Sequence, residues 1–171
     1  LLQQASAQGI ERIVLTPHWL PGYFENPAAK VKQALHALQT AAADIPITLR
    51  AAQEVRICAE LLNALPEKEL LFIGEHQGYK VLLLEFPGSH LTPGYDKLIR
   101  WLLNQKILPM IAHPERNREL LQHPERIKVL QQFGCLFQLT AAALLGDMGE
   151  DSRLLAERYL QDGYYHIIAT D

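Results

Sequence analysis

The chain has 171 residues, of which 49% are hydrophobic and 20% charged, and its formal net charge is −3 at pH 7. This composition is typical of a globular domain with a substantial core. It lacks the basic excess of proteins that bind nucleic acid or anionic membrane surfaces. No apolar run approaches the roughly 20 residues that cross a bilayer, so we expect no membrane insertion. Two cysteines are too few for a disulfide framework, which favours a cytoplasmic location.

Helix and strand signals alternate along the chain. In chain order we predict a helix at 1–8, a strand at 13–16, a helix at 31–42, a strand from 47 toward 54, a helix at 59–65, a strand at 81–84, a helix at 94–105, a strand at 108–112, a helix at 124–133, a strand at 135–139, helices at 141–146 and 151–161, and a strand at 166–171. Asn26 is expected to cap the second helix, with Pro27 in its first turn. Because hairpin signals are absent, this order indicates parallel strands, either in an open doubly wound sheet or in a βα barrel.

Residues that can bind metal ions stand where the predicted strands end. They are His18, Glu54, Glu85, His113 and Asp171, and Gln138 occupies a comparable position. In a parallel βα fold all strands end on the same face, so these side chains should converge. Carboxylates that crowd together bind protons or recruit cations. Imidazoles and carboxylates without thiolates suit manganese, iron, magnesium or zinc, and several carboxylates favour a cluster of ions.

One polar residue at a strand end is usually just the start of a loop, and this explanation applies to each position taken alone. A metal site explains better why such residues follow so many of the strands. Arg116 follows His113 by three residues and could hold an anionic group, because a guanidinium fork matches phosphate oxygens. From the spacing alone, a surface ion pair with Glu115 or Glu119 explains Arg116 equally well.

Three aromatic residues, Trp19, Tyr23 and Phe24, follow His18 and could line the mouth of this site, although such residues more often pack in a core. His90 is a further candidate for contact with a substrate.

Motifs for covalent catalysis are absent. Neither cysteine begins a Cys-x5-Arg phosphatase loop, since Ala64 and Ala141 stand at the arginine position. The chain also has no Gly-rich phosphate loop with a lysine and no Gly-x-Ser-x-Gly turn. The sequence therefore gives no support to a cysteine or serine nucleophile.

Six short motifs resemble a known family. They are Thr16-Pro17-His18, Gln53-Glu54-Val55-Arg56-Ile57, Leu84-Glu85-Phe86-Pro87, Ala112-His113-Pro114-Glu115-Arg116-Asn117, Gln138-Leu139-Thr140-Ala141 and Ala169-Thr170-Asp171. In this order they resemble the bacterial tyrosine-protein phosphatases of capsule and exopolysaccharide biosynthesis, the CpsB/CapC type of the polymerase-and-histidinol-phosphatase (PHP) superfamily. The resemblance spans essentially the whole chain.

The resemblance implies an α/β fold, a distorted seven-stranded (βα) PHP barrel, with residues 1–171 forming a single metal-dependent phosphoesterase domain. It implies a trinuclear metal site, commonly manganese, with the ligands His18, Glu54, Glu85, His113 and Asp171. By the same resemblance His113 and Arg116 are catalytic, and Arg116 holds the phosphate. The family's first strand, with its His-x-His pair, has no counterpart here. We therefore expect the domain to lack that strand and to be truncated at both ends.

The implied reaction is hydrolysis of phosphotyrosine on the tail of a polysaccharide-export kinase, by attack of a metal-bound hydroxide. Two alternatives stay open. One is a PHP phosphatase of a small phosphomonoester, such as histidinol phosphate or a sugar phosphate. The other is a non-catalytic truncated barrel that only binds a phosphorylated partner.

Overall fold

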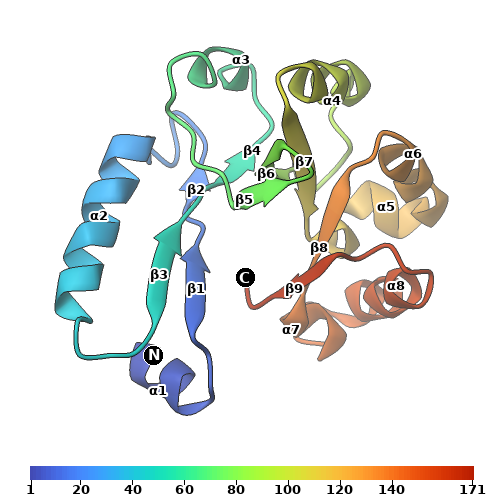
Figure 1. Cartoon of the computed structure of the whole chain (residues 1–171). Coiled ribbons are helices and arrows are strands. Elements are labelled where there is room, and N and C mark those ends of the chain that lie inside the picture. The colour runs from blue at the N-terminus through green and yellow to red at the C-terminus, as the bar shows by residue number, and fades with distance from the viewer. The chain divides into compact units, whose positions relative to one another are not determined.

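The computed structural model describes all 171 residues, which divide into two compact units, Leu1–Ile73 and Gly74–Asp171. The first unit contains pairs of short parallel strands (Figure 1). Its elements are α1 (Leu2–Ala7), β1 (Arg12–Leu15), β2 (His18–Trp19), α2 (Ala28–Ala41), β3 (Thr48–Ala51), β4 (Glu54–Arg56) and α3 (Leu61–Ala64). β1 pairs with β3, and β2 pairs with β4 so that His18 lies opposite Glu54.

The strand predicted at 13–16 corresponds to β1, which a second short strand, β2, follows, and the strand predicted from 47 toward 54 is divided into β3 and β4. Pro17 has no backbone N–H group to donate to the hydrogen bonds of a sheet. Strand pairing therefore resumes only at His18, opposite Glu54. The buried Ala52 and Gln53 likewise separate β3 from β4. The N–H of Glu54 donates to the carbonyl of Pro17 over 3.1 Å, which aligns the second pair of strands. His18 and Glu54 therefore begin β2 and β4, whereas the prediction had them end longer strands.

The predicted cap of the helix α2 is wrong. The helix begins at Ala28, and no side chain accepts a hydrogen bond from its first turn. The preceding Pro27 supplies an extended residue at the helix start. Asn26 instead donates from Nδ2 to the carbonyl of His18 over 2.9 Å. Asn26 thus fixes the start of β2 and leaves the helix uncapped.

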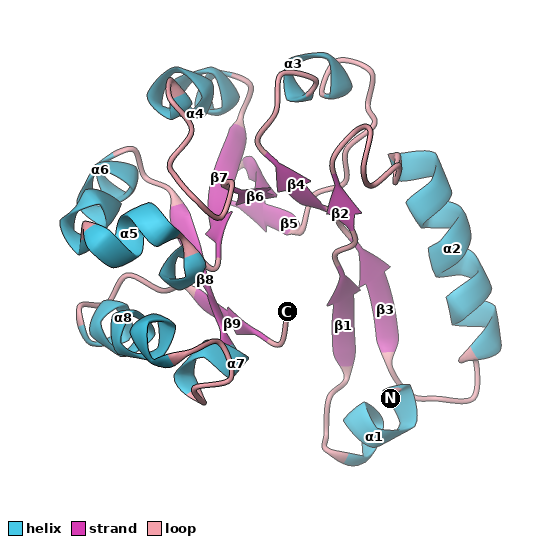
Figure 2. Cartoon of the chain, turned by 180° about the vertical axis from the view of Figure 1, so that it is seen from behind, coloured by secondary structure: helices cyan, strands magenta, loops and turns pink.

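The second unit is a run of parallel strands joined through helices. Its elements are β5 (Gly74–His76), β6 (Tyr79–Glu85), α4 (Tyr95–Asn104), β7 (Ile107–Ala112), the 3-10 turn η1 (Pro114–Arg116), α5 (Arg118–Gln122), the 3-10 turn η2 (Pro124–Arg126), α6 (Ile127–Gln132), β8 (Leu136–Thr140), α7 (Ala141–Leu144), α8 (Glu150–Gln161) and β9 (Ile167–Ala169). The strands β6, β7, β8 and β9 are neighbours in that order, and all their pairings are parallel. Figure 2 shows α4, α5, α6 and α8 on the same side of β7 to β9. This arrangement confirms the predicted α/β class with mainly parallel strands.

Two expectations for the second unit are wrong. β5 and β6 form an antiparallel hairpin, although no hairpin was predicted. Its turn places Gln77 and Gly78 at φ 51° and 79°, a two-residue left-handed turn for which glycine is suited. Gln138 does not end a strand, because β8 continues to Thr140 and Gln138 lies buried within it.

The core of this unit explains why the clearest predicted strand forms. Val81 to Leu84 of β6 are all buried, as expected for a parallel strand covered on both faces. The apolar face of α4 buries Ile99 and Leu102, and the helix packs against β7.

None of the helices combines the length and the apolar character that a membrane-spanning helix requires.

Candidate functional site

His18 and Glu54 form a pair in the first unit. The parallel register of β2 and β4 places them opposite each other, and His18 Nδ1 lies 4.0 Å from Glu54 Oε1. The Glu54 side chain is only 3% exposed, whereas that of His18 is 45% exposed. A buried carboxylate beside an accessible imidazole is an arrangement that can present two ligand atoms to a cation.

Gln53 and Asn26 hold this pair in place. The amide of the fully buried Gln53 donates to the carbonyl of Asn26 over 2.5 Å, and its Oε1 accepts from the N–H of Leu71 over 2.6 Å. Asn26 in turn donates to the carbonyl of His18. A chain of hydrogen bonds therefore links the residue before Glu54 to the backbone of His18.

Glu85 and His113 form the corresponding pair in the second unit. Glu85 ends β6, His113 directly follows the neighbouring strand β7, and both are buried. His113 Nε2 lies 3.7 Å from Glu85 Oε1, which is longer than a hydrogen bond. Neighbouring donor atoms bound to one ion at about 2.0–2.2 Å lie about 2.8–3.1 Å apart in octahedral and about 3.3–3.6 Å apart in tetrahedral coordination, so little movement would bring this pair onto a metal.

His113 has a strained backbone. Its φ of 31° and ψ of 59° lie in the left-handed region, which a non-glycine residue adopts at a cost of about 1–2 kcal/mol. This conformation lets the chain turn from β7 into η1, where the N–H of Arg116 donates to the carbonyl of His113 over 3.0 Å. Such strain is typical of functional sites, where the surrounding structure holds it.

Arg116 pairs with Asp171. Its Nη1 donates to Asp171 Oδ2, and both side chains belong to the second unit. The proposed surface pair with Glu115 or Glu119 is wrong, because Glu115 is buried elsewhere and Glu119 binds Arg126. The Arg116 side chain is 37% exposed, so part of it stays accessible beside the ion pair.

The residue between the histidine and the arginine, Glu115, is fully buried. Its two carboxylate oxygens accept from the N–H of Thr140 and from the hydroxyl of Tyr165, each over 2.9 Å, and its carbonyl accepts from Ser152 Oγ. Burial raises the pKa of the Glu115 carboxyl, and the hydrogen bond from Thr140 opposes this shift. Burial and the charge of Glu115 raise the pKa of Tyr165, so its hydroxyl stays protonated and donates. These contacts tie η1 to β8 and α8.

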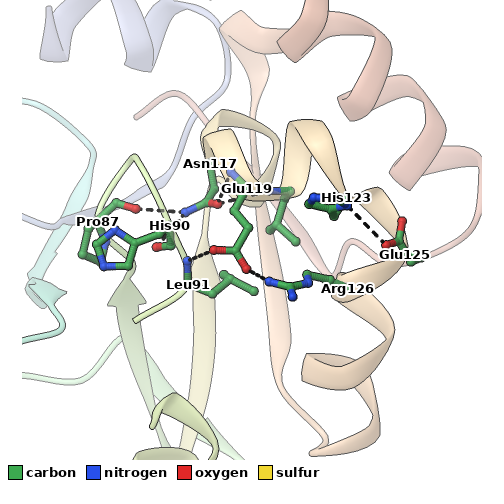
Figure 3. A network of polar contacts seen from close by, with 9 residues as sticks. Pro87, His90, Leu91, Asn117, Glu119, His123, Glu125 and Arg126 are labelled. Carbon is green, nitrogen blue, oxygen red and sulfur yellow. Dashed lines mark hydrogen bonds and ion pairs between the residues drawn. The ribbon is translucent and has the colours of Figure 1, made fainter. Parts of the chain in front are cut away.

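Asn117 joins the same turn to the loop after Glu85 (Figure 3). Its Nδ2 donates to the carbonyls of Pro87 and His90 over 2.9 and 3.2 Å. Its Oδ1 accepts from the N–H groups of Glu119 and Leu120, which caps α5. The loop is held again where the N–H of Leu91 donates to Glu119 Oε2. The chain segments that follow β6 and β7 are therefore fixed relative to each other.

The structure distinguishes the aromatic and histidine candidates. Trp19 is 3% exposed and packs in the core, whereas Tyr23 and Phe24 are 81% and 47% exposed. The Phe24 ring lies beside that of His18, with centroids 5.1 Å apart. The imidazole of His90 is hydrogen-bonded to its neighbour Ser89.

Sequence reasoning missed the supporting roles of Gln53, Glu115 and Asn117. A capping signal could have revealed Asn117, because an asparagine preceded by a turn and followed two residues later by a glutamate is typical of a helix start. The partners of Gln53 and Glu115 are distant in the chain, and no local pattern indicates them.

The sequence matches the family model for capsular polysaccharide synthesis, CpsB/CapC, over residues 1–171. The chain belongs to the CpsB/CapC family. CapC of Staphylococcus aureus is 34% identical over 173 residues, which cover 100% of this chain and 67% of CapC. The tyrosine-protein phosphatase YwqE of Bacillus subtilis is 32% identical over 173 residues, with the same coverage of both chains.

Crystal structures from the same family extend the likeness to three dimensions. The match is to one chain from a set of crystal structures of YwqE from Bacillus subtilis and CpsB from Streptococcus pneumoniae, which are described as metal-dependent tyrosine phosphatases. The TM-score is 0.89 at 31% identity, over 99% of this chain and 68% of the solved one. The CpsB/CapC fold thus accounts for nearly every residue of this chain.

Proposed function

We propose that this chain is a metal-dependent protein-tyrosine phosphatase. The observation that carries the proposal is the turn at His113–Arg116, which sets a buried imidazole beside a buried carboxylate and an arginine a few residues away. This combination suits hydrolysis of a phosphomonoester, because metal ligands and a guanidinium both act on phosphate oxygens. Relatives named tyrosine-protein phosphatases support the choice of substrate.

The proposed metal ligands are His18, Glu54, Glu85, His113 and Asp171, and the proposed metal is manganese. Their donor atoms are imidazole nitrogens and carboxylate oxygens, which fit manganese, iron, magnesium or zinc. When bound, such ions lower the pKa of a water ligand and neutralise charge on the phosphoryl group. The description of the YwqE and CpsB structures as metal-dependent supports a metal requirement.

Arg116 is proposed to bind the phosphoryl oxygens. Its guanidinium can offer two parallel N–H donors to a phosphate, a geometry that a lysine cannot reproduce. The ion pair with Asp171 orients the arginine before substrate arrives, which lowers the entropy lost on binding. As negative charge grows on the oxygens during the reaction, a fixed guanidinium stabilises it. His113 acts in this scheme as a metal ligand held rigidly by the turn.

We further propose that the substrate is phosphotyrosine on a polysaccharide-export kinase. The family's assignment to capsular polysaccharide synthesis supports this partner. We also propose that residues 1–171 belong to one PHP domain, whose complete form is the distorted seven-stranded barrel. The structural likeness, which covers 99% of this chain and 68% of the solved one, supports it.

The test measures hydrolysis of a phosphotyrosyl peptide by the purified chain. We expect activity with manganese, its loss after treatment with a chelator, and its return when manganese is added. His113→Ala should lose both metal and activity, whereas His123→Ala, at an exposed histidine paired with Glu125, should keep both. Full activity in metal-free protein would contradict the proposal. Faster turnover of histidinol phosphate than of the peptide would instead indicate that the substrate is a small phosphomonoester.

A further inference from the structure

The short loop that follows His18 is held by its own hydrogen bonds and carries two exposed aromatic side chains. Leu20 and Phe24 exchange two backbone hydrogen bonds, and the N–H of Tyr23 donates to the carbonyl of Leu20. Gly22 makes the turn possible with a φ of +83°, and its N–H donates to Glu25 Oε1 over 2.6 Å. These hydrogen bonds therefore hold the backbone from which Tyr23 and Phe24 project.

The loop is also bound directly to the proposed metal ligand. The Phe24 ring lies 5.1 Å from the His18 ring, centroid to centroid, with the planes tilted by 35°. Just after the loop, Asn26 donates to the carbonyl of His18. The Phe24 ring therefore lies directly beside the imidazole of His18.

Packing alone does not account for both aromatic residues. Trp19 is buried and serves the core, but Tyr23 is 81% exposed and Phe24 is 47% exposed. A hydrogen-bonded loop that holds the Phe24 ring beside a proposed metal ligand and exposes a second ring, that of Tyr23, has the character of a binding surface. Aromatic rings pair favourably when their centroids lie 4.5–7 Å apart. In phosphotyrosine only the ester oxygen separates the phenyl ring from the phosphorus atom, so the ring must lie close to the site that holds the phosphoryl group.

We infer that Phe24 and Tyr23 bind the phenyl ring of the substrate and so select aryl phosphates over alkyl phosphates. This inference rests on the proposed function, because it assumes that the phosphoryl group is held next to His18. The loop then distinguishes phosphotyrosine from phosphoserine and phosphothreonine, which have no ring to place against it.

The experiment compares kcat/KM on two peptides that differ only in carrying phosphotyrosine or phosphoserine. Phe24→Leu keeps an apolar side chain against His18 but removes the ring, and Tyr23→Ala changes a side chain that is mostly in solvent. For the double variant we expect kcat/KM on the phosphotyrosyl peptide to fall about tenfold, mainly through KM, since each aromatic contact contributes a factor of about 2 to 12. The value on the phosphoseryl peptide should stay within about twofold. Phe133→Leu, which removes a ring that lies under Arg100, should leave both values unchanged.

An equal fall on both peptides would overturn the inference, because Phe24 would then merely orient His18. Unchanged selectivity in the Tyr23→Ala and double variants would also overturn it. Calorimetry provides a second measurement that does not depend on catalysis. It compares the binding of phenylphosphonate and of methylphosphonate to the manganese-loaded protein. If the wild type binds phenylphosphonate more tightly and the double variant loses that preference, the inference holds even where neither peptide is hydrolysed. Absence of hydrolysis by the wild type would count against the proposed function alone.

Discussion

Two arginines near the histidine turn differ in their surroundings. Arg116 pairs with Asp171, while Arg118 is an exposed residue at the start of α5. We expect Arg116→Ala to keep its metal but to lose at least about a hundredfold in kcat, as loss of one donor to a developing oxyanion does. Arg118→Ala should keep nearly full activity. Elemental analysis and steady-state kinetics on both variants test this, and equal kinetics for the two would remove Arg116 from phosphate binding.

Glu115 offers a second prediction on the scale of single residues. Tyr165→Phe leaves one oxygen of a buried carboxylate without its donor, at a cost of about 1–3 kcal/mol in the free energy of unfolding. The control is Tyr159→Phe, which removes a buried hydroxyl that donates to the carbonyl of Pro124. Both variants should lower the urea midpoint, but only Tyr165→Phe should lower kcat, because Glu115 holds the turn that carries Arg116. A normal kcat in Tyr165→Phe would mean that the turn does not need this contact.

At the scale of elements, Asn117 combines two roles that substitution can separate. Asn117→Ala loses the cap of α5, a loss of about 1 kcal/mol, and also the two bonds to the loop after β6. Asn117→Asp keeps an oxygen for the cap but turns a second oxygen toward the carbonyls of Pro87 and His90. We expect both variants to lower the urea midpoint and metal affinity, since the loop and the turn adjoin Glu85 and His113.

The control for Asn117 is His90→Ala, which leaves the carbonyl of His90 in place and should change stability by less than about 0.5 kcal/mol. If Asn117→Asp behaves like the wild type, capping is the only role of this residue. A large loss of activity in His90→Ala would instead support a contact between the His90 side chain and the substrate.

The elements also indicate where prediction from sequence works. β6, β7 and α4 are recognisable because their apolar patterns match the period of a covered strand or an amphipathic helix. Glu85 and His113 could be placed at strand ends for the same reason. The breaks at Pro17 and Gln53 and the left-handed turn at Gln77 depend on hydrogen bonds and backbone angles that periodicity does not record.

At the scale of the whole molecule, parallel topology is what makes it possible to group distant residues from the sequence alone. Strand direction gives the end at which Glu85 and His113 lie, which is why they are neighbours although they are 28 positions apart in the chain (113 − 85). The partners of Arg116 and Glu115 could not be predicted in this way. They follow from packing of α8, β8 and the chain end against the turn.

Metal binding should stabilise the fold, and the ligands proposed in both units make this testable. A ligand that binds only the folded state at 100 times its Kd adds about 2.7 kcal/mol, which raises Tm by about 5–11 °C for a chain of this size. We expect this shift with manganese in the wild type and in His36→Ala, a control at an exposed histidine of α2. His18→Ala in the first unit and Glu85→Gln in the second should each reduce both the shift and the metal content. A full shift in either ligand variant would remove that residue from the proposed ligand set, and a full shift in both would leave only Glu54, His113 and Asp171 in it.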